Sequence, residues 1–149
     1  MSYDQIAAKL KQGQAIIIDG GTGTDIERRG AKMSTATWCA DANRNFGDII
    51  TEVHADYIKS GAEIIAANTF ATSMLSFNAY GRDSEVEELD ALAISYAKKA
   101  AAKTGAAVAG SFSTMRPVIA GTDRTTCRRT GQRRKPRNCS TARRRISKS

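Results

Sequence analysis

Residues 15–21 read Ala-Ile-Ile-Ile-Asp-Gly-Gly, and this short stretch decides the fold class. The run from Ala15 to Ile18 is continuously apolar and rich in β-branched side chains, rather than alternating between apolar and polar. A run of that kind is typical of a strand that is covered on both faces, as in a parallel sheet. The run stops at Asp19 and two glycines, so we expect a polar turn directly after the strand.

Two further stretches follow the same pattern. Residues 63–69 read Glu-Ile-Ile-Ala-Ala-Asn-Thr, and residues 106–111 read Ala-Ala-Val-Ala-Gly-Ser. In each, a short apolar run ends at a polar residue or a glycine. These patterns predict buried strands over 63–67 and 106–109.

Helical patterns separate the predicted strands. Residues 48–60 carry apolar side chains on one face, and Gly61 is placed to cap the helix end. Residues 84–104 predict a second helix, in which Ser84 and Glu87 form an S-x-x-E capping box and Gly105 follows the last turn. Its apolar stripe consists of Val86, Leu89, Ala93, Tyr96, Ala97 and Ala100.

The alternation of strands and helices predicts an α/β fold with right-handed βαβ units on a parallel sheet. A doubly wound sheet and a (β/α)8 barrel both fit this order. In both architectures, ligands bind beyond the carboxyl ends of the strands. We therefore expect Asp19, Asn68, Thr69 and Ser111 to converge on one functional edge.

Charge is distributed very unevenly along the 149 residues, although 41% of them are hydrophobic and the chain can bury a core. Residues 1–115 hold 11 basic and 14 acidic side chains, whereas residues 116–149 hold 12 basic and 1 acidic. Residues 125–149 also lack apolar periodicity, so we expect a disordered basic tail after a domain that spans residues 1–124. This tail is either an arginine-rich arm that binds nucleic acid or the result of a reading-frame error or a truncated product.

The glycine-rich turn after the first strand invites comparison with nucleotide-binding loops. A G-x-G-x-x-G fingerprint that begins at Gly21 requires a glycine at position 26, where the chain has Ile26, and no P-loop motif occurs. A tight turn between strand and helix is the plainer interpretation of the segment.

The cysteines and the amino terminus bear on metal binding and location. Cys39, Cys127 and Cys139 are odd in number and widely spaced, which predicts neither a disulfide framework nor a metal site. The amino terminus lacks a basic signal region, and the first apolar run is too short to span a membrane. We therefore expect a cytoplasmic protein without a membrane partner.

Several ordered motifs resemble one enzyme family. Residues 18–30 (IDGGTGTDIERRG), 53–65 (VHADYIKSGAEII) and 67–73 (ANTFATS), together with Trp38 and residues 109–111, resemble the homocysteine S-methyltransferase family over about residues 14–123. The resemblance implies the N-terminal portion of a (β/α)8 TIM barrel, with about three βα units. It also implies transfer of a methyl group to the homocysteine thiol, which gives methionine.

Family members use a zinc ion held by three cysteine thiolates. The zinc binds the substrate sulfur as its fourth ligand and lowers the pKa of the thiol. None of the three cysteines matches the family's zinc ligands, which lie toward the later strands. His54, the only histidine, is expected on a helix as a surface or packing residue and not as a ligand. We therefore expect no zinc to be held by this chain alone, and an inactive protein.

The resemblance implies roles for five residues, each of which has a structural alternative. Asp19 and Gly20 would hold the amino-acid end of homocysteine, although Asp19 is also a common turn-stabilising residue. Thr69 would line the same pocket, and Asn68 would either line it or satisfy loop backbone. Trp38 would lie near a cationic methyl donor, or would simply be a packing residue.

Two departures from the family pattern refine these expectations. Ala71 stands where betaine-using members have an aromatic residue, which favours S-methylmethionine or S-adenosylmethionine as the methyl donor. Three strands cannot close a barrel, so the sheet would keep an unpaired edge. We therefore expect poor solubility, partial folding or self-association through that edge.

Overall fold

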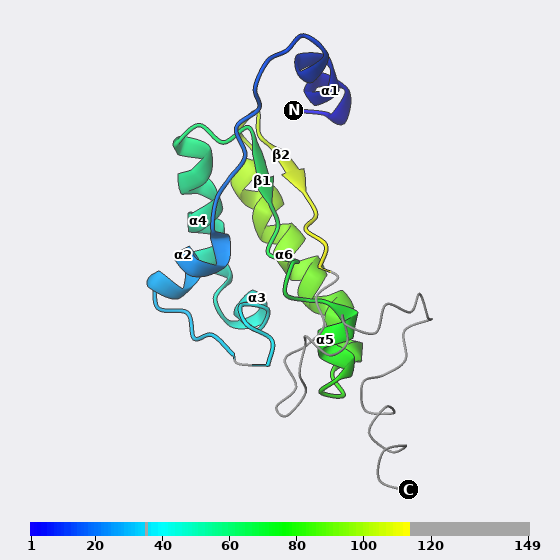
Figure 1. Ribbon diagram of the computed structural model, residues 1–149. Helices are drawn as coiled ribbons and strands as arrows, with labels where there is room; N and C mark the ends of the chain where they lie inside the picture. Colours follow the sequence, from blue (N-terminus) through cyan, green and yellow to red (C-terminus); the bar gives the residue numbers. More distant parts are fainter. Residues whose placement is uncertain (35, 114–149) are drawn as a thin grey trace, which may run out of the picture. The chain divides into compact units, whose positions relative to one another are not determined.

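The computed structural model describes residues 1–34 and 36–113 (Figure 1). The predicted domain boundary at residue 124, the basic tail over 125–149, and the cysteines Cys127 and Cys139 lie outside the described residues.

A small parallel sheet forms the centre of the described chain. Strands β1 (Ile64–Ala66) and β2 (Ala107–Ala109) pair in parallel, with Ile65 opposite Val108. The first apolar run joins the free side of β1 through a parallel bridge between Ile18 and Ile64. The sequence-based prediction of a mixed α/β fold with a parallel sheet is confirmed.

The first apolar run departs from its prediction as a strand covered on both faces. It makes a single bridge, and the exposed fractions of Ile17 and Ile18 are 57% and 66%. The run pairs with β1 on one side, where the carbonyl of Ile17 accepts hydrogen bonds from the N–H groups of Glu63 and Ile64. It has no strand bridge on its other side among residues 1–34 and 36–113, so its side chains gain little burial.

Helix α4 (Gly47–Lys59) agrees closely with the helix predicted over 48–60. The predicted cap at Gly61 is confirmed, because this residue has a φ of +106° directly after the last helical residues. Its N–H donates to the carbonyl of Ile58 at 2.9 Å, and the N–H of Ala62 donates to the carbonyl of Tyr57 at 3.0 Å. These two bonds are the Schellman pattern, which favours glycine at the left-handed position.

Helix α6 (Val86–Ala101) occupies most of the segment predicted over 84–104. The predicted capping box is wrong, because a 3-10 turn, η1 (Asp83–Glu85), leads into the helix and no side chain caps its first turn. The cap position falls on Glu85, so Ser84 lies one residue before it, inside the 3-10 turn. Gly105 does not follow the last turn directly either, since the helix ends at Ala101 and residues 102–105 form turns and bends.

Four helices were not predicted from the sequence. They are α1 (Tyr3–Lys11), α2 (Thr22–Arg28), α3 (Ala42–Asn45) and α5 (Met74–Asn78). Helix α1 begins with a reciprocal capping box between Ser2 and Gln5 and buries none of its residues. An ion pair between Lys9 and Glu63 links α1 to the residue before β1.

Helices α4 and α6 pack against each other and against the sheet. Ile65 of β1 and Ala97 of α6 are fully buried in one cluster, against which Tyr57 and Val108 pack. A second cluster joins α2 to α4 through Ile26, Ile50 and Val53, and a third joins Phe77 of α5 to Leu89 of α6. Within the described residues, no helix has the length and hydropathy that crossing a bilayer requires.

Candidate functional site

Asp19 lies at the end of the first apolar run and is bound to the neighbouring strand. Its N–H donates to the carbonyl of Ile64 at 3.0 Å, and its carboxylate accepts a hydrogen bond of 2.8 Å from the N–H of Ala66. Partial burial raises the pKa of Asp19, although hydrogen bonds from Ala66 and Thr22 oppose that shift. The carboxylate is therefore fixed at the strand end and half-buried.

Gly20 packs closely against a side chain from α4. A Cβ atom at this position would lie 3.2 Å from the Tyr57 hydroxyl oxygen and 3.3 Å from its ring. Glycine thus lets the phenol of Tyr57 approach the backbone beside Asp19. Tyr57 carries no sequence signal of a binding residue, because it falls within the helix predicted over residues 48–60, where an aromatic side chain suits the apolar face.

Trp38 is held in an uncommon backbone conformation at the same edge. Its φ of +49° is the only positive value of a non-glycine residue within 1–34 and 36–113. Ser34 and Trp38 exchange two backbone hydrogen bonds of 2.8 and 2.9 Å, which close a tight loop. A bulky side chain adopts this conformation only where its surroundings impose it, and such residues gather at functional sites.

The indole of Trp38 packs between α2 and the end of β1. A Cβ atom at Gly23 would lie 3.0 Å from the indole, so the ring rests on the helix backbone. On another side, Phe70 meets Trp38 edge to face, with ring centroids 6.4 Å apart and planes at 86°. The two side chains keep exposed fractions of 46% and 37%, so they form an aromatic surface that solvent can reach.

Asn68, which follows β1, is buried and fully engaged with protein groups. Its amide nitrogen donates to the carbonyl of Cys39 at 3.1 Å and to the side-chain oxygen of Asn43 at 2.8 Å. Its own side-chain oxygen accepts a 3.1 Å hydrogen bond from the Cys39 thiol. This geometry favours the alternative in which Asn68 satisfies loop backbone.

Thr69 connects the ends of the two strands. Its hydroxyl donates to the carbonyl of Ser111 at 2.8 Å and accepts from the N–H of the same residue at 2.9 Å. The carbonyl of Thr69 accepts a hydrogen bond from the hydroxyl of Thr72, which in turn bonds to Asp90 of α6. The ends of β1 and β2 therefore meet at Thr69 and Ser111 as predicted, whereas the buried side chain of Asn68 turns instead toward Cys39 and Asn43.

The described residues do not fit a zinc site of the thiolate type. No group of three or more His, Cys, Asp or Glu side chains within 1–34 and 36–113 could hold a metal ion. Cys39 is buried, and burial raises the pKa of its thiol to about 11. A neutral thiol that donates to Asn68 is a poor metal ligand, because zinc binds the thiolate.

His54 is fully buried on α4, and neither ring nitrogen has a hydrogen-bond partner among the described residues. Burial alone lowers the pKa of His54 to about 4, so the imidazole is neutral at pH 7. Its predicted place on a helix is confirmed, and of the two roles considered for it, surface and packing, the structure shows packing.

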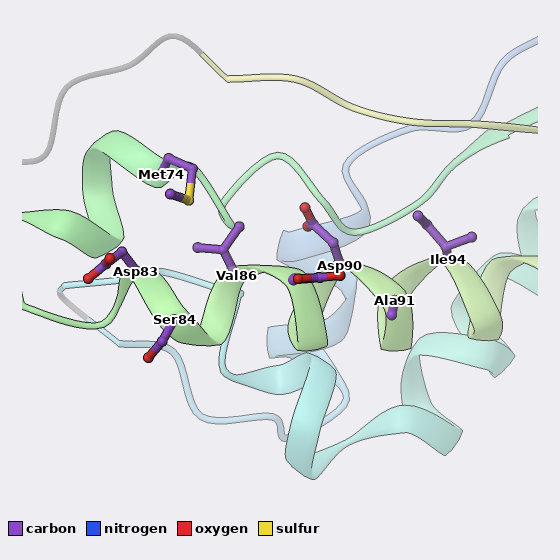
Figure 2. Close-up of a pocket in the computed structure, with 8 residues that line it drawn as sticks. Met74, Asp83, Ser84, Val86, Asp90, Ala91 and Ile94 are labelled. Carbon is purple, nitrogen blue, oxygen red and sulfur yellow. The ribbon is translucent and has the colours of Figure 1, made fainter.

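One hollow on the described surface lies away from the predicted site residues. It has a volume of about 560 Å³ and runs beside α6, where Met74, Val86 and Ile94 provide apolar walls and Asp83 and Asp90 provide carboxylates (Figure 2). None of the five residues predicted for substrate binding lines it. The candidate site is instead the open edge where Asp19, Gly20, Trp38, Thr69 and Phe70 lie.

The chain is similar to known methyltransferases. The chain is 34% identical over 102 residues to a selenocysteine methyltransferase of Astragalus bisulcatus, which covers 67% of this chain and 30% of the relative. It is 34% identical over 88 residues to homocysteine S-methyltransferase 2 of Arabidopsis thaliana, which covers 58% of this chain and 26% of the relative. The chain thus spans less than a third of the length of these relatives.

A solved structure has a similar fold over part of its length. The metallated form of the homocysteine methyltransferase MmuM from Escherichia coli superposes with a TM-score of 0.59 and 29% identity, over 70% of this chain and 40% of that one. A model of the family described as homocysteine S-methyltransferase matches residues 16–132, which extends past the predicted boundary at residue 124. Because that match covers most of the sequence, the chain belongs to the homocysteine S-methyltransferase family.

Proposed function

We propose that this chain carries the substrate-facing edge of a homocysteine S-methyltransferase, built as the first three or so βα units of a (β/α)8 barrel. The observation that supports this most directly is the aromatic pair Trp38 and Phe70, half-exposed at the strand ends that hold Asp19 and Thr69. Phe70 directly follows Thr69, and Trp38 rests on Gly23 in the helix that follows Asp19. Groups suited to a cation and to an amino acid therefore share one edge.

In this proposal, Asp19 binds the ammonium group of homocysteine. Its carboxylate accepts hydrogen bonds from the N–H of Ala66 and from the side chain of Thr22, and its remaining acceptor capacity would meet the ammonium. Backbone N–H groups around Gly20 bind the substrate carboxylate, and Thr69 lines the pocket while it joins the strand ends. Asn68 contributes indirectly, because its side chain fixes the loop that carries Trp38.

The aromatic pair binds the methyl donor. S-methylmethionine and S-adenosylmethionine both carry a positive sulfonium, which the electron-rich face of an indole attracts. In the reaction, the homocysteine sulfur forms a bond to the donor methyl while the methyl–sulfonium bond breaks, and the donor leaves as a neutral thioether. Such a displacement depends mainly on alignment, which a fixed aromatic wall provides.

Methyl transfer requires the homocysteine thiol to be activated as a thiolate. Within residues 1–34 and 36–113 no side chains form a zinc–thiolate site that could do this. We therefore propose that the chain alone binds its ligands without turning them over. Binding and turnover can be measured separately, which makes the proposal testable.

Calorimetric titration of the chain with S-methylmethionine and with homocysteine tests binding. We expect both to bind, Asp19→Asn to weaken homocysteine selectively, and Trp38→Ala to weaken S-methylmethionine selectively. Glu27→Gln, on the exposed face of α2, is a matched charge control that should change neither affinity. Equal loss of both ligands in both site variants, or no binding at all, would contradict the proposal.

The basic segment supports a competing function. Residues 125–149 carry many arginines and no acidic residue, so nucleic-acid binding through phosphate contacts is a second candidate, although these residues lie outside the described ones. Salt-sensitive affinity for DNA or RNA that disappears on deletion of residues 125–149 would support it. Unchanged affinity after the deletion would exclude the segment as the cause.

A further inference from the structure

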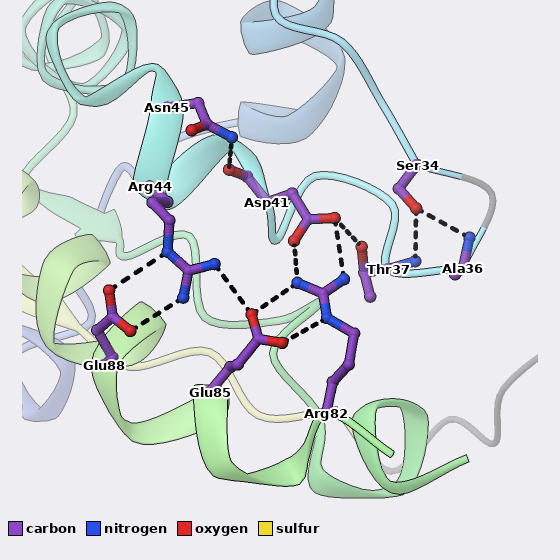
Figure 3. Close-up of polar contacts among 9 residues, drawn as sticks. All are labelled: Ser34, Ala36, Thr37, Asp41, Arg44, Asn45, Arg82, Glu85 and Glu88. Atoms are coloured by element: carbon purple, nitrogen blue, oxygen red, sulfur yellow. Dashed lines mark hydrogen bonds and ion pairs between the residues drawn. The ribbon is translucent and has the colours of Figure 1, made fainter. Parts of the chain in front are cut away.

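The loop that carries Trp38 is tied to the start of α6 by a network of charged side chains (Figure 3). Arg82, in the connection between α5 and η1, is its centre. Its guanidinium contacts both carboxylate oxygens of Asp41, at 2.7 and 3.3 Å, and both of Glu85, at 2.7 and 2.8 Å. The guanidinium of a second arginine, Arg44 of α3, binds Glu85 and Glu88, whereas the hydrogen bond of Arg44 to Asp41 joins backbone groups.

The contact between Arg82 and Asp41 continues into the Trp38 loop. Asp41 accepts a 2.7 Å hydrogen bond from the hydroxyl of Thr37, which is almost fully buried and directly precedes Trp38. The N–H of Thr37 donates to the hydroxyl of Ser34 at 3.3 Å, and Ser34 closes the loop through its backbone bonds to Trp38. A continuous chain of contacts therefore runs from Arg82 to the backbone of Trp38.

Arg82 is itself held in place. Its guanidinium lies over the ring of Phe77, 5.2 Å from the ring centroid, and Phe77 is fully buried in the core. The hydrogen bond to Arg82 is the main reason that the pKa of Asp41 lies below its usual value, so Asp41 remains charged near neutral pH. A planar guanidinium can hold two carboxylates in fixed directions, which a lysine ammonium cannot do.

We infer that Arg82 is a positioning residue that acts through Asp41 and Thr37 to hold Trp38 in its left-handed conformation. This backbone conformation is unfavourable for tryptophan and persists only where surrounding contacts impose it. With the conformation held, the indole stays against Gly23 and edge-on to Phe70, facing solvent. The consequence for methyl-donor binding rests on the proposed function, whereas the effect on Trp38 itself does not.

Trp38 is the only tryptophan of the chain, so its fluorescence reports on this loop without interference. We expect Arg82→Gln in the full chain to shift Trp38 emission to longer wavelength and to increase its quenching by acrylamide. Hydrogen exchange measured by mass spectrometry should speed up over residues 34–41 and remain unchanged in α4. Arg44→Gln is the matched control, because it removes bonds to Glu85 and Glu88 but none to Asp41, and it should leave both readouts unchanged.

If Arg82→Gln lowers the far-UV circular dichroism, Asp41→Asn provides the second test, since it breaks the same contact from the other side. It should reproduce the change in Trp38 emission, and the double variant should add little to either single one. Equal effects of Arg82→Gln and Arg44→Gln, or an unchanged Trp38 signal in a folded Arg82→Gln or Asp41→Asn protein, would overturn the inference.

Titration with S-methylmethionine separates this inference from the proposed function. If the unmodified chain binds it, Arg82→Gln should weaken binding roughly tenfold, the order of a lost cation–π contact. If the unmodified chain does not bind it, the proposed function fails, and the fluorescence and exchange results still decide the role of Arg82.

Discussion

Asn68 and Asn43 hold each other through two hydrogen bonds. The amide nitrogen of Asn68 donates to the side-chain oxygen of Asn43 at 2.8 Å, and the amide nitrogen of Asn43 donates to the backbone carbonyl of Asn68 at 3.0 Å. Asn43 also donates to the carbonyl of Leu89 in α6 at 3.2 Å. This buried pair therefore joins the end of β1, helix α3 and helix α6 behind the candidate site.

Replacing either asparagine should destabilise the protein. Asn68→Ala and Asn43→Ala each leave buried polar groups without partners, which costs about 2–4 kcal/mol of the free energy of unfolding. The double variant should lose clearly less than the sum, because both single changes break the same bond. Urea unfolding followed by circular dichroism measures all three, and additive losses would show that the two side chains act independently.

The strand ends and the main helices could be predicted from the sequence because local signals specify them. A continuous apolar run that stops at a polar residue marks β1 and β2, and Gly61 marks the end of α4. The supporting contacts could not be predicted, since they join residues far apart in the chain. The contacts of Asn68 with Asn43 and of Arg82 with Asp41 are examples, since their sequence separations are 25 and 41 residues.

Other differences between the predicted and the observed elements arose because tertiary contacts, or their absence, outweigh the local preference of the sequence. Ser84 and Glu87 have the spacing of a capping box, yet Glu85 is bound to Arg82 and the chain enters α6 through a 3-10 turn instead. The run 15–18 has the composition of a central strand, yet only one of its sides meets a partner strand in the described part of the chain. Phe70 could have been proposed from the sequence, because it directly follows Thr69 in a quoted motif.

Gly23→Ala should disturb Trp38 even though alanine favours helices. In an ordinary helix this change stabilises by roughly 0.5–1 kcal/mol. Here the new methyl group would lie 3.0 Å from the indole of Trp38 and 3.2 Å from the Cys39 sulfur. Such overpacking lowers the free energy of unfolding by about 1–3 kcal/mol, which should outweigh the gain in helix stability. We expect lower stability together with altered Trp38 emission.

Gly21→Ala provides the matched control for this change at the start of the same helix. A Cβ atom at position 21 meets only Thr24, at an ordinary 3.8 Å, so Trp38 emission should stay the same. A Gly23→Ala protein that is more stable than the unmodified chain, with the same emission spectrum, would show that the indole does not rest on α2.

Because of His54, the free energy of unfolding should depend on pH even above the pH range in which carboxylates titrate. Its folded pKa is about 4, whereas the unfolded chain has a pKa near 6.5, so the unfolded state binds a proton first as the pH falls. Stability is therefore fully present above about pH 6.5 and declines toward pH 4, by up to about 3 kcal/mol. The carboxylates with lowered pKa values, Asp41, Glu63 and Glu85, keep their charge through the upper part of this window.

His54→Leu tests this cause directly. Leucine fills a similar volume without two unpaired ring nitrogens, so we expect about 1 kcal/mol of added stability at pH 7 and a flat profile between pH 6.5 and 5. Thermal or urea unfolding at several pH values measures both effects. If the stability of the variant declines by the same amount as the pH falls, titrating groups other than His54 cause the decline.

The side chains of the first apolar run should drive self-association. Ile17 and Ile18 are more than half exposed, and the backbone beside them is bonded to β1 on one side only within the described chain. An exposed apolar edge of this kind pairs readily with another chain, and a lysine placed there opposes such pairing. We expect sedimentation velocity to show association that grows with concentration, and Ile18→Lys to reduce it without changing the far-UV circular dichroism.

Tyr3→Lys, at an exposed position on α1, is the control for added charge and should associate as the unmodified chain does. If the unmodified chain sediments as a monomer at every concentration, the edge is covered or inert, and if both lysine variants dissociate equally, net charge rather than the edge controls the assembly.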